Sequence, residues 1–333
     1  MTKQQPKIKI KEKKTMKFVN PFDYKNECIA IWNSYVESGE VVFKPLDEAG
    51  FDGLFLRQGI NHVRAGLLDE EGLAGFGFAN YADGAIVAYI TYIGVRQDVR
   101  GKGVADKILQ SLEEQLKKEN PALEKIELVF YNPCQLAWFI PNAAPHDHPG
   151  APGVDMASAA YRFFTKAGYV DYAIQNAYYL PLSNYVYPEA IAEGIERLKG
   201  EEIEIGYYDN DKHYGFPEFF DNIKNEGWRK QVLARLDQRI VVATHNGKVV
   251  GYTGPLTISE EGRGMFCGIG VHTEYRQHGI GKIIFANMCK SHSENGASFM
   301  SLFTGTTNPA RKIYEGAGFG IVRSFADMRK VLN

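Results

Sequence analysis

The stretch VRQDVRGKGVADKILQSL begins at Val95, and the stretch VHTEYRQHGIGKIIFANM begins at Val271. Each follows Ile-Gly, and each places an arginine five residues after the valine, a glycine three residues later, and an alanine or glycine two residues after that. A long pattern that recurs within one chain indicates a repeated structural unit. The sequence therefore predicts two copies of one fold.

Length and composition agree with two domains. The chain has 333 residues, enough for two domains of about 150 residues each. Its net charge of -2 and its 23% of charged residues are ordinary for a soluble protein and give no sign of nucleic-acid binding. Residues 1–15 carry six lysines against one glutamate and have no apolar run. We expect a basic disordered leader there, and neither a signal peptide nor a membrane span.

The four cysteines, Cys28, Cys134, Cys267 and Cys289, are scattered and do not form metal-ligand spacings. We expect reduced, mostly buried thiols, no metal site and a cytoplasmic protein.

Each half shows the same order of apolar strands and amphipathic helices. In the first half we expect a strand at 85–95, a helix at 104–120, a strand at 125–131, a helix at 155–168 and a strand at 169–182. In the second half we expect a hairpin at 239–255 that turns at Asn246-Gly247, a strand at 264–271, a helix from 280, a strand at 298–305, a helix at 308–318 and final strands from 319.

The predicted fold class is α/β (α+β), with two tandem units that each have a mixed, mostly antiparallel sheet flanked by helices. The predicted divisions are the leader 1–15, an N-terminal unit at 16–182, a linker helix at 183–199 and a C-terminal unit at 200–333.

Each repeated stretch places a glycine turn between a strand end and a helix start. The first N–H groups of a helix lack intrahelical partners, so such a turn is suited to a phosphate or pyrophosphate. It is not a P-loop, because no G-x-x-x-x-G-K-[ST] occurs. It is not the dinucleotide fingerprint either, because Asp106 and Ile284 stand at the third glycine position.

The turns match the pattern [Q/R]-x-x-G-x-[G/A], as RGKGVA from Arg100 and RQHGIG from Arg276, and each half then has a helix ending in a Gly-aromatic pair. The chain resembles the GCN5-related N-acetyltransferase (GNAT) family, in a tandem layout similar to that of mycothiol synthase. The resemblance implies that the turns hold the pyrophosphate of acetyl-CoA. The residues expected to bind this co-substrate are Ile269, Val271, Arg276, Gln277, His278, Gly279, Ile280, Gly281, Lys282 and Asn308 in the second unit, and Val95, Arg100, Gly101, Lys102, Gly103 and Ala105 in the first.

The two units differ four residues before the Gly-aromatic pair, where the second unit has Tyr314 and the first has Phe164. The resemblance implies that Tyr314 is the catalytic acid that protonates the departing thiolate, a role worth about 10²–10⁴-fold. Phe164 has no proton to give. From the residues alone, Tyr314 shares a helix face with Ala310 and Ala317, so core packing is the competing interpretation.

The first unit also has a longer connection, Asn132 to Asp155, which is rich in Pro and Gly. A loop of this length needs a reason in a compact domain: it covers a substrate pocket, packs on the second unit or binds a partner. A metal site built from His146 and His148 is the sharper but less favoured hypothesis.

These features predict an acetyl-CoA-dependent N-acetyltransferase that moves the acetyl group to a primary amine by direct attack, with its main site in the second unit. Two alternatives stay open. In one, the first unit or both units are catalytic. In the other, the chain is a non-catalytic acyl-CoA sensor. A small-molecule amine is favoured over a protein as the acceptor, and no nucleic-acid or membrane partner is expected.

Overall fold

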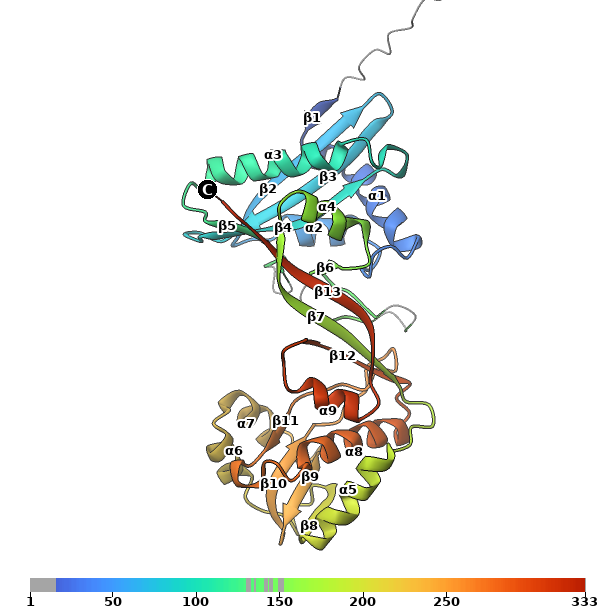
Figure 1. Ribbon diagram of the computed structural model, residues 1–333, viewed down its shortest axis with the longest axis vertical. Helices are drawn as coiled ribbons and strands as arrows, with labels where there is room; N and C mark the ends of the chain where they lie inside the picture. The colour runs from blue at the N-terminus through green and yellow to red at the C-terminus, as the bar shows by residue number, and fades with distance from the viewer. Residues whose placement is uncertain are drawn as a thin grey trace, which may run out of the picture.

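The structure, a computed structural model, describes residues 16–129, 133–134, 136–140, 143, 146–148 and 153–332. The leader predicted at 1–15 lies outside the described residues, as does part of the connection at 132–155. The molecule is elongated, with one lobe from each half of the chain and two long strands crossing between them (Figure 1).

The first half contains the helices and strands of the upper lobe in Figure 1. They are β1 (Lys17–Val19), the 3₁₀ helix η1 (Pro21–Tyr24), α1 (Lys25–Glu37), α2 (Glu48–Phe55), β2 (Asn61–Asp69), β3 (Gly72–Tyr81), β4 (Val87–Val95), η2 (Gln97–Val99), α3 (Val104–Glu119), β5 (Lys125–Leu128), β6 (Val154–Asp155), α4 (Ala159–Lys166) and β7 (Val170–Pro181).

The second half begins with a helix that follows β7. Its elements are α5 (Glu189–Gly200), β8 (Ile203–Tyr207), α6 (Phe216–Ile223), α7 (Glu226–Leu233), β9 (Val241–His245), β10 (Lys248–Thr253), β11 (Ile269–Val271), η3 (Thr273–Tyr275), α8 (Ile280–Glu294), β12 (Phe299–Gly305), α9 (Arg311–Gly316) and β13 (Gly320–Val331).

Helix α3 follows from its sequence pattern. Its buried residues include Val104, Ile108 and Leu112, which recur every four residues and so form one apolar face. This face packs on β3, where Gly77 allows a close approach: a Cβ there would lie 2.7 Å from Cγ2 of Ile108. The pattern thereby fixes α3, and the turn before it, against the sheet.

The predicted hairpin of the second half is confirmed. Strands β9 and β10 pair in antiparallel fashion, and both turn residues have positive φ, 50° at Asn246 and 77° at Gly247. These values are those of the type I′ turn, which Asn-Gly favours.

The two halves exchange their last strands. The larger sheet has the order β1-β2-β3-β4-β5-β13-β7-β12, with β6 paired to β13, and the smaller sheet has the order β11-β10-β9-β8. Strand β13 of the second half therefore lies between β5 and β7 of the first half, and β7 lies beside β12 of the second (Figure 1). Chain order and spatial order differ here, and the residues from 320 form one strand rather than several.

Strands β4 and β5 separate toward the glycine turn. Their parallel register covers Val87–Tyr89 of β4, and β4 then continues to Val95. The register of β4 against β3 shifts at this point, because Tyr92 pairs with Phe78 but Ile90 pairs with Ala79. Thr91 is thus an extra residue, and such a bulge bends a strand.

The corresponding strand of the second half is shorter than predicted. Of the strand expected at 264–271, only Ile269–Val271 belongs to β11. The preceding residues follow another course, since Ile258 and Gly264 form an isolated bridge and Gly268 has a φ of 126°. A φ in this range departs from the regular strand backbone and favours glycine.

Candidate functional site

The first glycine turn has a backbone that only glycine adopts without strain. Gly101 and Gly103 have φ values of 72° and 79°, and α3 begins at the next residue. A Cβ at either glycine would meet nothing within 4 Å, so open space faces the turn. The first amides of α3 lack intrahelical partners, which fits this turn to a pyrophosphate.

A cavity of about 570 Å³ lies in front of this turn. Its walls come from the α1–α2 connection, the separating ends of β4 and β5, the turn itself, α4 and β13, as the lining residues Val42, Ile93, Gly103, Phe164 and Phe325 illustrate. The cavity therefore occupies the opening between β4 and β5. Its size lies within the range of small-molecule sites.

The predicted residues of the first turn meet at this cavity. Val95, Arg100, Gly101, Gly103 and Ala105 all line it. Lys102 is the exception, since its Nζ donates to the carbonyl of Asp98, 2.7 Å away.

Arg100 holds one edge of the cavity. Its Nη1 lies 2.9 Å from Oε1 of Glu40 and 2.9 Å from Oε1 of Gln97. The hydrogen bond to Glu40 raises the pKa of Arg100, so the guanidinium stays charged. Beside it, the Tyr35 hydroxyl donates to the carbonyl of Val95 at 2.6 Å, and burial raises the pKa of Tyr35.

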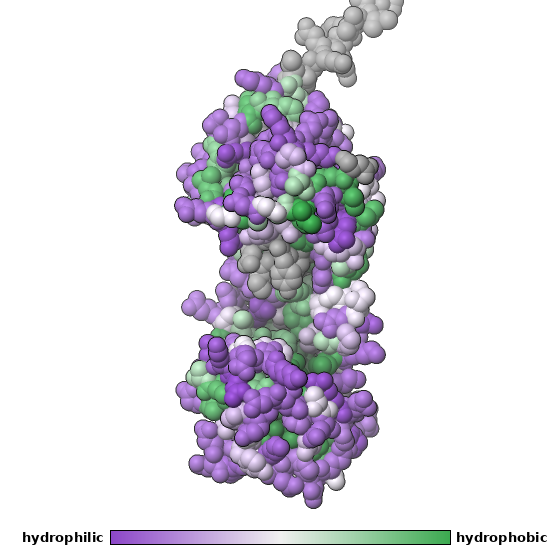
Figure 2. Space-filling view, turned by 90° about the vertical axis from the view of Figure 1, so that its left-hand side faces the viewer, coloured by the Kyte–Doolittle hydropathy of each residue, from purple (hydrophilic) through white to green (hydrophobic). Residues whose placement is uncertain are grey.

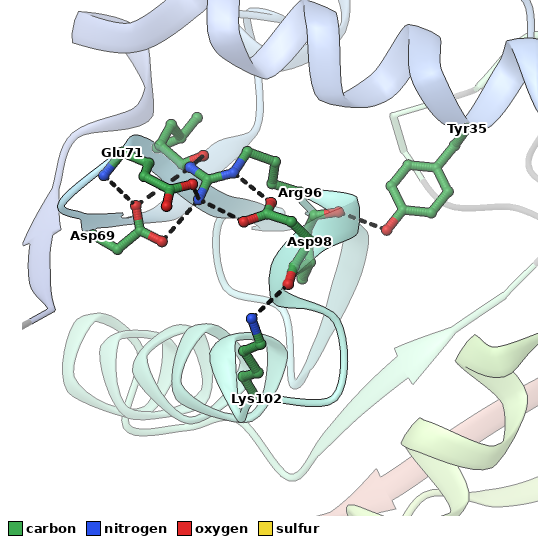
Figure 3. Close-up of polar contacts among 8 residues, drawn as sticks. Tyr35, Asp69, Glu71, Arg96, Asp98 and Lys102 are labelled. Atoms are coloured by element: carbon green, nitrogen blue, oxygen red, sulfur yellow. Dashed lines mark hydrogen bonds and ion pairs between the residues drawn. The ribbon is translucent and has the colours of Figure 1, made fainter. Parts of the chain in front are cut away.

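A network that the sequence analysis missed supports the same turn (Figure 3). Arg96, the first residue after β4, contacts Asp69 at 2.9 Å through Nη2 and Asp98 at 2.6 Å through Nε. Glu71 lies 3.4 Å from the same guanidinium. The hydrogen bond between Arg96 and Asp98 is the main cause of the raised pKa of Arg96. The network ties the start of the turn to the β2–β3 hairpin. An arginine directly after a strand and two acids in a hairpin were the available signals.

The second glycine turn has the same backbone but different surroundings. Gln277 and Gly279 have φ values of 75° and 77°, close to those of the first turn. Here Arg197 of α5 donates to the carbonyl of His278, and a Cβ on Gly279 would lie 3.4 Å from Nη2 of Arg197. Glu201 accepts from Nδ1 of His278 at 2.8 Å, and this bond lowers the pKa of Glu201. Arg197 of α5 and Glu201, the residue after α5, therefore contact the second turn at His278, and residues 276–278 remain exposed.

The other predicted residues of the second unit lie around that turn. Arg276 is exposed, with Nε 3.4 Å from the carbonyl of Val271, and the Asn308 side chain accepts from the amide of Ala310 at 3.0 Å. Ile280 is buried in the core, whereas Ile269 and Val271 lie on β11, and Gly281 and Lys282 lie in the first turn of α8.

Tyr314 lies in the core of the second lobe. Its side chain is 8% exposed, and its ring centroid lies 5.2 Å from that of Phe285 and 6.2 Å from that of Phe266. Burial raises the pKa of Tyr314. Its counterpart Phe164 lines the cavity of the first half.

His146 and His148 join the first half to the second. Nε2 of each histidine lies within 3.0 Å of the Ser301 hydroxyl on β12, and Arg263 approaches Nδ1 of His148 at 3.4 Å. All four side chains are buried. The described part of the long connection thus packs on the second half. Among the described residues, no group of three or more His, Cys, Asp or Glu could hold a metal ion.

In the view of Figure 2, hydrophilic residues cover most of both lobes, and hydrophobic residues gather in patches on the upper lobe and at the waist between the lobes. None of the helices in the described part of the chain is both long and apolar enough to cross a membrane.

Comparison with known proteins identifies related sequences and folds. Residues 28–135 and 201–319 match the model of the acetyltransferase (GNAT) family. The chain is similar to the GCN5-related glucosamine N-acetyltransferase region of a fungal multi-domain GH3 β-N-acetylglucosaminidase, with 17% identity and a TM-score of 0.55 over 98% of this chain and 40% of that one. It thus spans less than half of that longer protein.

Two further structures match over nearly their full length. A tandem GNAT protein from the clavulanic acid biosynthesis pathway gives 14% identity and a TM-score of 0.53, over 95% of this chain and 98% of that one. A GCN5-related N-acetyltransferase from Sphaerobacter thermophilus also gives 14% and 0.53, over 95% of each chain. At these identities the likeness establishes the fold. No curated protein matches the sequence significantly.

Proposed function

Because this chain belongs to the acetyltransferase (GNAT) family and is therefore an acyltransferase, we propose that its first half binds acetyl-CoA and transfers the acetyl group to an amine. One observation carries this proposal: the 570 Å³ cavity lies directly in front of an open glycine turn. The family match itself covers both halves and does not choose between them.

Each part of the cavity has a use in binding acetyl-CoA. Backbone amides after Gly101 and Gly103 would hold the pyrophosphate, and Arg100 would add a charge-assisted contact once it leaves Glu40. The β4 edge beyond Tyr89, which lies outside the described β5 register, would hydrogen-bond the pantetheine arm. The apolar walls at Ile93, Phe164 and Phe325 would exclude water from the thioester.

The proposed reaction is direct transfer. The neutral amine attacks the thioester carbonyl, the C–S bond breaks, an amide forms, and the CoA thiolate takes up the proton that the amine loses. Phe164 has no proton to supply, so in this proposal the proton that reaches the sulfur is the one that the amine loses, and no side chain acts as the acid. The favoured acceptor is a small-molecule amine.

The second half is the alternative site, with Tyr314 as the acid. Two observations count against it: the 570 Å³ cavity lies at the first turn, and the Tyr314 ring is packed among Phe266 and Phe285. A non-catalytic acyl-CoA sensor would also need the cavity, but it would not release thiol.

Calorimetric titration with acetyl-CoA tests the proposal on a matched pair of variants. We expect one site per chain, at least tenfold weaker binding in Arg100→Ala, and unchanged binding in Arg276→Ala. The opposite pattern would move the site to the second half. No binding by the wild type would refute the proposal, and binding without thiol release across a broad panel of amines would favour the sensor.

A further inference from the structure

We propose that Arg162 and Lys166 of α4 form a site for a phosphate monoester, the 3′-phosphate of CoA. This inference rests on the proposed function, since it concerns the same cavity. It adds a second anion site to the glycine turn, built from side chains rather than from backbone amides.

The two cations occupy one face of one helix. Arg162 and Lys166 are four residues apart, a spacing that places side chains next to each other on a helix surface. Both line the cavity together with Phe163 and Phe164, and both are exposed. They therefore stand at the rim of the cavity, above its aromatic wall.

Arg162 and Lys166 form no hydrogen bond and no ion pair with the residues that the structure describes. The other cavity-lining guanidinium, Arg100, is paired with Glu40 at 2.9 Å. Two unpaired cations side by side repel each other, and a doubly charged phosphate relieves that repulsion. Arginine can in addition bind two phosphate oxygens at once.

The remaining carboxylates of the cavity leave this rim positive. Asp155 is paired with Arg323 of β13 and also accepts from the amide of Ala157 at 2.9 Å. Asp106, exposed in the first turn of α3, is the remaining carboxylate among the described residues that line the cavity. The rim between α3 and α4 thus carries a net charge of about +1 before a ligand binds.

The position of the rim suits the nucleotide end of the ligand. The glycine turn, Ala105 of α3 and α4 all line the same cavity. With the pyrophosphate at the turn and the pantetheine arm along β4, the remaining end of CoA is the phosphorylated nucleotide. The cations of α4 are then the available partners for its monoester.

The second half lacks this pair. The two halves correspond at an interval of 150 residues, because Ser158, Phe164 and Gly168 match Asn308, Tyr314 and Gly318. The counterparts of Arg162 and Lys166 are Lys312 and Gly316. Only one cation remains there, which supplies a matched control.

Binding of two probes, acetyl-CoA and 3′-dephospho-acetyl-CoA, tests the inference in the full-length protein. We expect the wild type to bind acetyl-CoA at least tenfold more tightly than the dephospho form. In the double variant Arg162→Gln/Lys166→Gln, this ratio should fall below threefold, with unchanged affinity for the dephospho form. Lys312→Gln should keep the wild-type ratio, and added salt should reduce that ratio in the wild type and in Lys312→Gln but not in the double variant.

Equal affinity of the wild type for both probes would overturn the inference while leaving the proposed function intact. A ratio that survives in the double variant would do the same. Failure of the wild type to bind either probe would instead refute the proposed function. Circular dichroism and the melting temperature check that each variant is folded.

Discussion

The two glycine turns of this protein share a backbone and differ in what surrounds it. Both have positive φ at the second and fourth residues of the motif, Gly101 and Gly103 in one turn and Gln277 and Gly279 in the other. The first turn opens onto a cavity, whereas the second is contacted by the side chains of Arg197 and Glu201. A matching motif therefore establishes the shape of a turn, while its neighbours decide whether a ligand can reach it.

The contacts to the second turn come from the linker helix α5 and the residue after it, which follow the first half in the chain. In the described part of the first half, α1 and α2 lie between β1 and β2, and their connection lines the cavity. Duplication thus placed two equal turns in unequal surroundings. The following predictions test that difference.

The largest effect is expected from a carboxylate placed at the first turn. Gly103→Asp should weaken acetyl-CoA binding at least 100-fold, or about 2.7 kcal/mol, because the new charge faces the pyrophosphate. Aspartate tolerates the left-handed conformation better than most residues, so the fold should survive. The matched variant Gly279→Asp should bind normally in the same titration, and equal losses in the two variants would remove the distinction between the turns.

Removing the guanidinium beside the first turn should cost stability. Arg96→Met leaves Asp69, whose side chain is 4% exposed, without its main cation, and we expect a loss of about 2 kcal/mol in the free energy of unfolding. Urea denaturation measures this loss. The equivalent His272→Ala of the second turn should cost less than about 0.5 kcal/mol. A similar loss in both variants would show that the network around Arg96 has no special role.

Acid should weaken the contact between the halves. Burial, the Arg263 charge and His146 lower the pKa of His148 to about 2, whereas an unfolded histidine titrates near 6.5. The folded protein then binds fewer protons than the unfolded chain below pH 6.5, so stability falls as the pH falls. From pH 7 to pH 5 we expect a loss of about 2 kcal/mol from this group.

The variant His148→Gln supplies the control for that measurement. It keeps a polar side chain but cannot take up a proton, so its stability should change less between pH 7 and pH 5 than that of the wild type. Identical pH dependence in the two proteins would mean that His148 is not the group that responds. The comparison needs only chemical denaturation at two pH values.

Exchanging the second residues of the turns should have a small effect. Gln277→Gly relieves a left-handed backbone in a residue with a Cβ, at the cost of a more flexible unfolded chain. We expect a net gain of about 0.5 kcal/mol, and a loss of similar size in Gly101→Gln. Changes of opposite sign in the melting temperatures of Gln277→Gly and Gly101→Gln would show that both turns keep this backbone in solution.

The smallest effect is expected at Tyr314. If transfer takes place in the first half, Tyr314→Phe should leave kcat within about twofold of the wild type, because a general acid would otherwise contribute at least 10²-fold. A fall of tenfold or more in steady-state turnover would restore the second half as the catalytic unit.

The local features of this fold could be predicted from sequence, because they depend on neighbouring residues. The helix after Gly103 follows from the spacing of Ile108 and Leu112, and the hairpin at Asn246-Gly247 follows from the φ values that this dipeptide favours. The exchange of β7 and β13 could not be predicted. Both are 12-residue strands after a Gly-aromatic pair, and nothing in either strand specifies its neighbour in the sheet.

The candidate site also has parts that could be predicted from sequence and parts that could not. The turn residues were predicted from the motif, but the Arg96 network joins residues 27 positions apart, a contact that only the folded hairpin creates. The contact between Arg197 and the second turn also depends on where α5 packs. Sequence reasoning therefore favoured the second unit for Tyr314, and the cavity favours the first.

Hydrogen–deuterium exchange of the full-length protein, with and without acetyl-CoA, tests the central claim most directly. We expect slower exchange in peptides that cover the first turn and α4, and no change in peptides that cover residues 276–283. Protection at the second turn, with the first unchanged, would contradict the account.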